Sequence, residues 1–161
     1  MTPPPERDRD QVGRPRSARP RDQAGRPLEP GAAGIDRVPD DLALDADQTL
    51  VLAQESLDAD APFTAHEVLE ARWRTGPDDE KDLWQGLAQL AVALTHLQRD
   101  NPTGAESLLR RGADHLAAWS GDQPHAIDVA ALTAWAEELA DEIDRFGQPA
   151  DGVQMPRLTG D

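Results

Sequence analysis

The sequence predicts an all-α fold, a compact bundle of about five helices built from two helical hairpins and a C-terminal helix. From about residue 42 onward, apolar residues recur three and four positions apart between turn signals, which is the period of a helix buried on one face. Nowhere does this part of the chain alternate apolar and polar residues as a half-buried strand does.

The helices are placed by their turn and capping residues. We expect them at about 42–57, 62–74, 79–99, from 102 onward, and 128–146. Pro62 is a favoured first-turn residue, Asp128 is a good N-cap, and Gly147 stops the last helix. Residues 83–98 contain no Asp, Glu, Lys or Arg in a chain where 29% of residues are charged, so the third helix is expected at the centre of the core. The last helix presents Leu132, Ala136, Leu139 and Ile143 on one face.

The first forty residues differ in composition from the rest. They hold eight of the fourteen prolines and eight of the sixteen basic residues, and they show no apolar period. Such a composition is typical of a disordered tail. We therefore expect a disordered Pro/Arg/Asp-rich tail at 1–40, a helical domain at 41–147 and a flexible C-terminal tail at 148–161.

Charge and composition exclude several classes of function. Residues 41–161 carry 8 basic and 24 acidic side chains, a net charge of −16 that repels nucleic acid. The N-terminus has no apolar leader and the longest apolar stretch, LAQLAVAL at 87–94, is too short to span a bilayer, so we expect a cytoplasmic protein without a membrane partner. The chain has no cysteine, so any metal must be held by histidine and carboxylate. A protein partner or self-association stays open.

An internal repeat is visible at an offset of forty residues, where a helix end, a turn and a helix start recur. The coinciding pairs are Leu57/Leu97, Asp60/Asp100, Pro62/Pro102, Ala65/Ala105 and Leu69/Leu109. The match is explained either by a hairpin used twice or by the ordinary chemistry of helix starts.

A histidine and a glutamate fall on the packing face of the second helix. In AHEVLEARW, residues 65–73, the side chains of His66 and Glu70 lie on the same face as Leu69 and Trp73. Burying such groups without partners costs about 2–7 kcal/mol each on transfer scales, so partners are required. The third helix supplies them if it runs antiparallel to the second. The expected polar cluster is His66, Glu70, Gln85, Gln89 and His96, with Asn101 as a helix cap beside it.

Three interpretations of this cluster are open. A structural hydrogen-bond network is favoured, because such networks are satisfied without chemistry. The second is a metal site for zinc or manganese held by His66, Glu70 and His96. The third is metal-free acid–base chemistry at Glu70 or His66. The sequence HEVLE is not the HExxH motif of zinc proteases, since Glu70 stands where the second histidine belongs.

The remaining aromatic and histidine residues give weaker signals. Trp73, Trp84, Trp119 and Trp135 sit at helical spacing among apolar neighbours and are expected in the core. His115 and His125 lie near a polar loop and are expected to be solvated.

AHEVLEARW, followed by QGLAQLAVALTHLQRDNPTGAESLLRRG, resembles the domain-of-unknown-function family 309, a group of small helical prokaryotic proteins. The family shows an HExLE..W helix, a QGLxQ..A..H helix and a GN..GA turn, and the resemblance covers about residues 42–146. The matching positions are His66, Glu67, Glu70, Trp73, Gln85, Gly86, Gln89, His96, Asn101, Gly104 and Ala105. Asp100 stands where the family usually has glycine, which is expected to loosen the turn.

The resemblance implies an all-helical fold and, by an inference sometimes attached to the family, a metal-dependent hydrolase. Two classes of function follow. The first is a structural, small-ligand-binding or partner-binding module. The second is a metal-dependent hydrolase with Glu67 or Glu70 as the general base.

Overall fold

A computed structural model describes residues 42–119, 124–150 and 153–160, and it confirms the all-α class. The five α-helices are α1 (Ala46–Asp58), α2 (Pro62–Thr75), α3 (Lys81–Gln98), α4 (Pro102–Ala118) and α5 (Val129–Phe146). Two short 3₁₀ helices, η1 (Asp78–Glu80) and η2 (Pro124–Ala126), precede α3 and α5. The tail predicted at residues 1–40 lies outside the described residues, so the domain boundary there stays a prediction.

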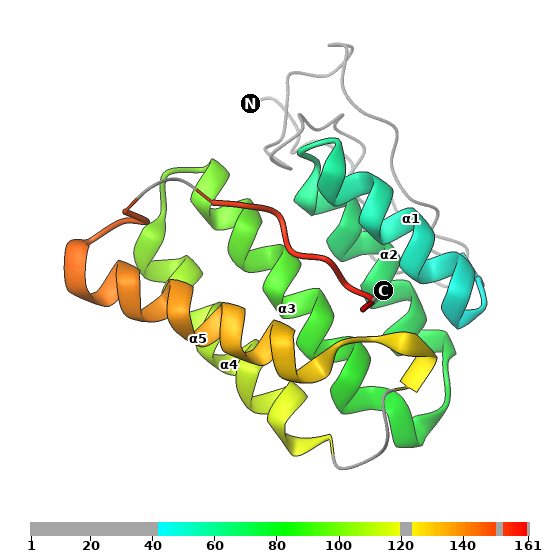
Figure 1. The fold of residues 1–161 in the computed structure, drawn as a ribbon. Helices are drawn as coiled ribbons and strands as arrows, with labels where there is room; N and C mark the ends of the chain where they lie inside the picture. The colour runs from blue at the N-terminus through cyan, green and yellow to red at the C-terminus, as the bar shows by residue number, and fades with distance from the viewer. Residues whose placement is uncertain (1–41, 120–123, 151–152, 161) are drawn as a thin grey trace, which may run out of the picture.

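Each helix packs against the next one along the chain, α1 on α2, α2 on α3, α3 on α4 and α4 on α5 (Figure 1). The hairpins α1–α2 and α3–α4, followed by α5, are the predicted architecture. Helix α3 lies between α2 and α4, and its Leu83, Trp84 and Leu87 are buried, as are Leu90 and Leu94 one and two turns on. This central position explains why α3 contains no charged side chain from residue 83 onward.

Helix α1 begins four residues later than the apolar period predicts, at Ala46 rather than Leu42. The reason is a capping box. The Asp45 carboxylate accepts from the Gln48 backbone N–H at 2.8 Å, and the Gln48 side chain accepts from the Asp45 N–H at 3.2 Å. Both predicted ends of α5 are confirmed. Asp128 is its N-cap, and Gly147 ends the helix with a φ of 77°.

The two hairpin turns have the same backbone geometry. Asp60 and Asp100 both adopt the left-handed conformation, with φ of 59° and 58°. The residue after each donates its N–H back across the helix end, Ala61 to the Ser56 carbonyl and Asn101 to the His96 carbonyl, both at 2.8 Å. The forty-residue repeat is therefore present in the structure as well as in the sequence. The expectation that Asp100 loosens its turn is wrong, because the turn is closed by the same hydrogen bonds.

Replacing Asp100 by glycine is expected to raise the free energy of unfolding by up to about 1 kcal/mol, because glycine adopts positive φ without the steric cost of a Cβ. Asp100→Ala removes the same carboxylate and keeps the Cβ, so it should be less stable than the wild type. Urea unfolding of the two variants checks this order. Equal stability of the glycine and alanine variants would show that the turn conformation costs nothing.

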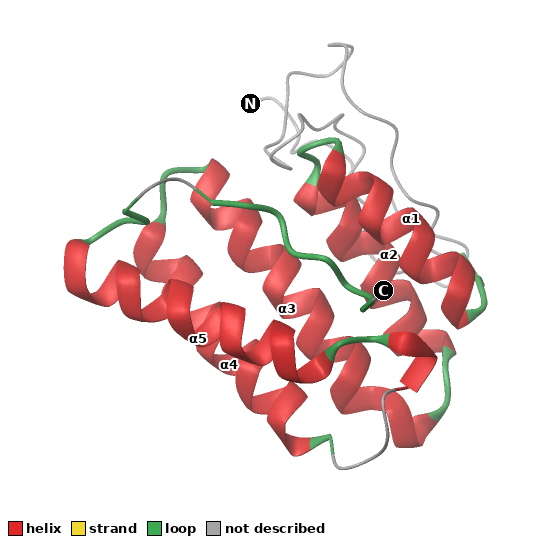
Figure 2. Cartoon of the chain, viewed as in Figure 1, coloured by secondary structure: helices red, strands yellow, loops and turns green. Residues whose placement is uncertain are grey.

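The C-terminal residues pack on the bundle, which the sequence did not predict. The described part of the expected flexible tail, 153–160, is drawn as a loop that crosses from the α5 side of the molecule toward α1 (Figure 2). Leu158 is only 3% exposed and joins the core, and Thr159 forms an isolated antiparallel bridge with Ile127. The apolar Leu158 has too few neighbours in sequence to give a helical or strand period, so its burial left no signal.

Among the described helices, none is long and apolar enough to cross a membrane.

Candidate functional site

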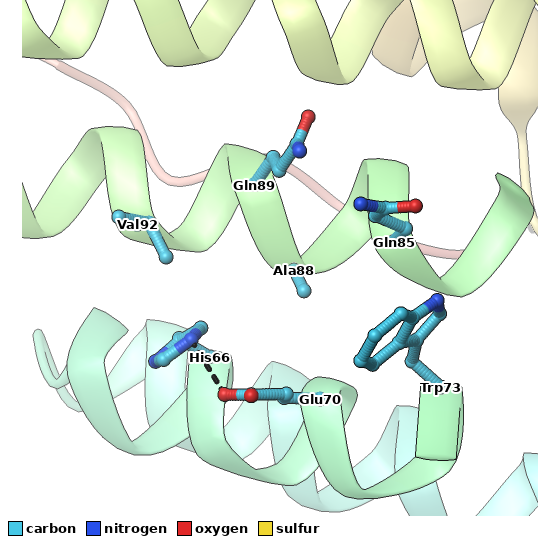
Figure 3. A pocket seen from close by; sticks show the side chains of 7 residues that line it. All are labelled: His66, Glu70, Trp73, Gln85, Ala88, Gln89 and Val92. Atoms are coloured by element: carbon cyan, nitrogen blue, oxygen red, sulfur yellow. Dashed lines mark ion pairs between the residues drawn. The ribbon is translucent and has the colours of Figure 1, made fainter. Parts of the chain in front are cut away.

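A pocket of about 150 Å³ lies between α2 and α3 (Figure 3). Its side chains come from one face of each helix. They are His66, Glu70 and Trp73 on α2, and Gln85, Ala88, Gln89 and Val92 on α3. In Figure 3, Ala88 and Val92 are the α3 side chains directed toward His66 and Glu70, whereas the Gln89 amide is directed away from α2. Four of the residues of the expected polar cluster therefore line one pocket.

His66 and Glu70 form an ion pair within one turn of α2. The His66 Nε2 lies 3.0 Å from the Glu70 Oε2, and the Arg74 Nη1 lies 3.3 Å from the Glu70 Oε1. The hydrogen bond from His66 lowers the pKa of Glu70, burial raises it, and the charges of His66 and Arg74 lower it further, so the net shift is downward. Glu70 is ionised at neutral pH and fixes the Nε2–H of His66 toward itself.

Two buried polar atoms of the pocket residues have no hydrogen-bond partner in the protein, the Nδ1 of His66 and the Oε1 of Gln89. When the His66 imidazole is neutral and carries its proton on Nε2, Nδ1 is an acceptor, and an amide oxygen is always an acceptor. Leaving a buried acceptor unsatisfied costs about 1–3 kcal/mol. The expected structural network is thus incomplete, since the glutamines do not bond to His66 or Glu70.

Trp73 borders the pocket at the C-terminal end of α2. It is partly buried and packs against the core, whereas Trp84 is fully buried. The Lys81 ammonium donates to the Trp73 carbonyl and lies 5.5 Å from the centre of its ring. The expectation of a core role holds for Trp84, while Trp73 is shared between the core and the pocket.

His96 and Asn101 belong to the α3–α4 turn and do not line the pocket. The Asn101 Nδ2 donates to the His96 Nδ1 at 2.9 Å, and the Asn101 Oδ1 accepts from the Gly104 N–H at 3.2 Å. Burial and the charge of Arg99 lower the pKa of His96, which suits a neutral acceptor. A Cβ at Gly104 would lie 2.5 Å from the Asn101 Nδ2, so a larger residue there would displace the Asn101 side chain. Asn101 caps α4 as expected, and the predicted cluster divides into two.

The three-ligand metal set expected from the sequence is not assembled. No group of three or more His, Asp or Glu side chains in the described part of the chain is placed to hold a metal ion. His96 is directed to its own turn, which leaves His66 and Glu70 as one nitrogen and one oxygen donor. Glu67, the other candidate general base, is partly buried and is not among the pocket residues.

A second polar cluster joins η1, α2, α3 and η2. The Glu80 Oε1 accepts from the Trp84 Nε1 at 3.0 Å and lies 3.0 Å from the His125 Nε2. Burial raises the pKa of Glu80, but the hydrogen bonds from Trp84 and His125 and the charges of His125 and Arg72 lower it by more. His125 is therefore not merely solvated, as the sequence suggested. The Glu80–Trp84 spacing of four is a local signal, but nothing in the sequence indicates the contact with His125.

The other weakly indicated histidine also has a partner. The His115 Nδ1 lies 3.0 Å from the Asp82 Oδ1, across the α3–α4 pair. The pair is largely exposed, so it adds little to stability.

Comparisons with known proteins find a similarity over the segment that contains the pocket. The model of the family "Domain of unknown function (DUF309)" matches residues 50–108, a range that includes α2, α3 and all seven pocket residues. The "Uncharacterized protein YpuF" of Bacillus subtilis (strain 168) is 46% identical over 57 residues, which is 35% of this chain and 33% of that protein. The chain thus spans about a third of the length of the curated relative it matches. No solved structure matches it significantly. The segment from residue 50 to residue 108, which contains the α2–α3 pocket, is similar to the DUF309 family.

Proposed function

We propose that this chain is a binding module and that the α2–α3 pocket is its ligand site. The observation that carries the proposal is the pair of unpartnered acceptors, His66 Nδ1 and Gln89 Oε1, on residues that line one pocket. A ligand that donates a hydrogen bond to His66 Nδ1 and, once the Gln89 amide turns toward α2, another to Gln89 Oε1 recovers the free energy lost by burying these atoms. The ligand is therefore a donor of at least two N–H or O–H groups.

The charge of Glu70 and the ring of Trp73 restrict the class of ligand further. Glu70 is ionised beside the pocket, and the partly buried Trp73 borders it with an aromatic ring. A carboxylate and an aromatic face are the groups that attract an ammonium or guanidinium ion. A pocket of about 150 Å³ holds only a small group. We infer a small alkylammonium or alkylguanidinium group, either free or at the end of a larger molecule.

The proposal differs from a purely structural network in what the pocket side chains do. In a network, Gln89 would stabilise the fold through His66 or Glu70, but no hydrogen bond joins them. The hydrolase alternative needs a metal, and only His66 and Glu70 among the expected ligands face each other. Both alternatives are therefore outcomes that the following experiment separates.

Four-carbon probes of different charge test the ligand class. Butylammonium and butylguanidinium are expected to bind at about millimolar concentration, the range for a fragment of so few atoms, and to perturb the NMR signals of α2 and α3. Butyrate has the same number of carbon atoms as butylammonium and the opposite charge, so it should not bind. Gln89→Leu keeps the side-chain size but removes the acceptor, and it should weaken butylammonium binding about tenfold, the equivalent of one hydrogen bond.

Gln148→Leu is the matched control, because Gln148 is exposed beyond α5 and far along the chain from the pocket. It should bind butylammonium as the wild type does. Unchanged binding in Gln89→Leu, or equal binding of butyrate, would contradict the proposal. A rise in Tm on adding zinc or manganese that disappears in both Glu70→Gln and Glu70→Ala would instead favour the hydrolase.

A further inference from the structure

The chain's own residues 156–160 form an extended segment between α1 and the start of α5, with a pocket on each side of it, and we call the space that the segment and these two pockets occupy the groove. Figure 1 shows the course of the segment. Its backbone is bound from two sides. On the α1 side, Gln54 donates from Nε2 to the Pro156 carbonyl at 3.1 Å and accepts from the Leu158 N–H on Oε1 at 2.8 Å. One glutamine side chain thus forms hydrogen bonds with both a backbone carbonyl and a backbone amide of the segment.

On the α5 side, the partner is the backbone that leads into the helix. The Asp128 N–H donates to the Leu158 carbonyl at 3.2 Å, and the Gly160 N–H donates to the Ala126 carbonyl at 3.0 Å. This is the antiparallel bridge between Ile127 and Thr159. Main-chain hydrogen bonds of this kind bind an extended peptide whatever its sequence, and side-chain pockets then select it.

The side chains of the segment alternate as in a bound strand. Pro156 and Leu158 are buried and Arg157 between them is exposed, with its Nη1 3.9 Å from the Asp58 Oδ2. Leu158 is the anchor, because it is 3% exposed and belongs to the core cluster. The groove therefore buries a leucine side chain and has room for a proline two positions before it.

The resident segment does not fill the groove. A cavity of about 510 Å³ lies between it and α1, and one of about 320 Å³ lies between it and α5. The α1 wall of the larger cavity carries Asp47, Glu55 and Asp58, and it includes Val51, which is 59% exposed. The only basic side chain of the resident segment is Arg157. A peptide with more basic residues would match this acidic wall better.

The groove edge is held in an unusual backbone conformation. His125 and Ala126 are consecutive non-glycine residues with positive φ, 54° and 61°. Left-handed residues of this kind persist only where surrounding contacts fix them, and they are enriched at ligand-binding sites. Here the conformation is accompanied by the His125–Glu80 contact at 3.0 Å and presents the Ala126 carbonyl to the segment.

We propose that this groove is a recognition site for an extended peptide of another protein with the pattern Pro–basic–Leu and further basic residues, and that residues 156–160 occupy it in cis. The partner displaces the resident segment and uses the same Gln54 and Asp128 contacts. The resident segment competes because its tether gives it an effective concentration on the order of millimolar. The site is separate from the α2–α3 pocket.

Displacement can be measured on the unmodified chain. An unlabelled peptide VQMPRLTG, the sequence of residues 153–160, is added in excess to the ¹⁵N-labelled full chain. The amide signals of Leu158 and Gly160 are expected to move to the positions of an unstructured segment, while signals of α3 stay in place. A peptide with alanine for leucine should have no effect. Unchanged Leu158 and Gly160 signals at saturating VQMPRLTG would overturn the proposal.

Binding in trans is measured with a fluorescent VQMPRLTG peptide by anisotropy. The full chain carrying Leu158→Ala should bind it at least about tenfold more tightly than the wild type, because the resident competitor has lost its anchor. Adding Gln54→Leu should reverse the gain about tenfold, while Gln148→Leu should not. Absence of binding to a Leu158→Ala chain with native circular dichroism would contradict the proposal.

A basic peptide KKMPRLKK should bind more tightly than VQMPRLTG, which tests the acidic wall. Glu70→Gln in the α2–α3 pocket should leave both peptides unaffected, so this proposal and the ligand proposal fail independently. Wild-type dimers that dissociate when VQMPRLTG is added would show that a second copy, rather than a different partner, is the occupant, and would overturn the assignment.

Discussion

Replacing Trp84 by alanine is expected to lower the free energy of unfolding by about 3–5 kcal/mol, the range for a fully buried large aromatic side chain. Trp84 is 0% exposed and lies in the first turn of α3. Its loss leaves a cavity beneath α2. It also removes the hydrogen bond that the Trp84 Nε1–H donates to the Glu80 carboxylate. The Arg72 guanidinium lies 5.4 Å from the ring centre and loses that contact too.

Trp84→Phe separates the two contributions. Phenylalanine keeps most of the apolar volume but leaves the Glu80 carboxylate with one donor fewer, so the expected loss is about 1–3 kcal/mol. Both variants are compared with the wild type by urea unfolding, with the slope checked for constancy. A loss below about 1 kcal/mol in Trp84→Ala would mean that the core rearranges to close the cavity, and the central role of α3 would be wrong.

The fold could be predicted because each helix carries its own local signals. Prolines at first turns, Asp128 and Gly147 mark ends whose chemistry is short-range, and the uncharged run in α3 marks the core. The start of α1 was placed too early because Leu42 continues the apolar period, whereas the Asp45–Gln48 box decides where the helix begins. Periodicity reports burial, and Leu42 is partly buried without being helical.

The pocket could be predicted only as far as helical geometry reaches. Residues at i and i+4 share a face, so His66 with Glu70 on one helix and Gln85 with Gln89 on the next were expected to lie near each other, and all four line one pocket, but no hydrogen bond joins the two pairs. His96 lies two turns beyond Gln89 on the same face. The helix ends there, and the His96 Nδ1 accepts a hydrogen bond from the side chain of Asn101, the cap of α4. A face defined by angle alone does not say where along the axis the neighbouring helix stops.

Contacts between segments far apart in the chain could not be predicted from the sequence. His125 meets Glu80 across 45 positions, and Leu158 meets Gln54 across 104. Both depend on how η2 and the C-terminal segment fold back over the helices, which is decided by long-range packing rather than by local propensity. The peptide groove follows from these contacts, so it could not have been inferred before the structure.

The last helix is expected to be as much a part of the core as α3. Leu139 and Ile143 lie on one face of α5 and are 6% and 4% exposed. Truncating either to alanine should lower the free energy of unfolding by about 2–5 kcal/mol, the usual range for buried leucine and isoleucine. The packing of α5 on α4 would then contribute to the stability of the protein, although α5 lies outside the DUF309 match, which ends at residue 108.

Phe146→Ala is the matched control on the same helix. Phe146 is 59% exposed and contacts the guanidinium of Arg145, so its truncation should change stability by less than about 0.5 kcal/mol, the level of a surface site. Urea unfolding of the three single variants gives the comparison. If Leu139→Ala and Ile143→Ala also fall below that level, α5 is peripheral, and the groove that its first residues form with α1 would lack the rigid wall that peptide recognition requires.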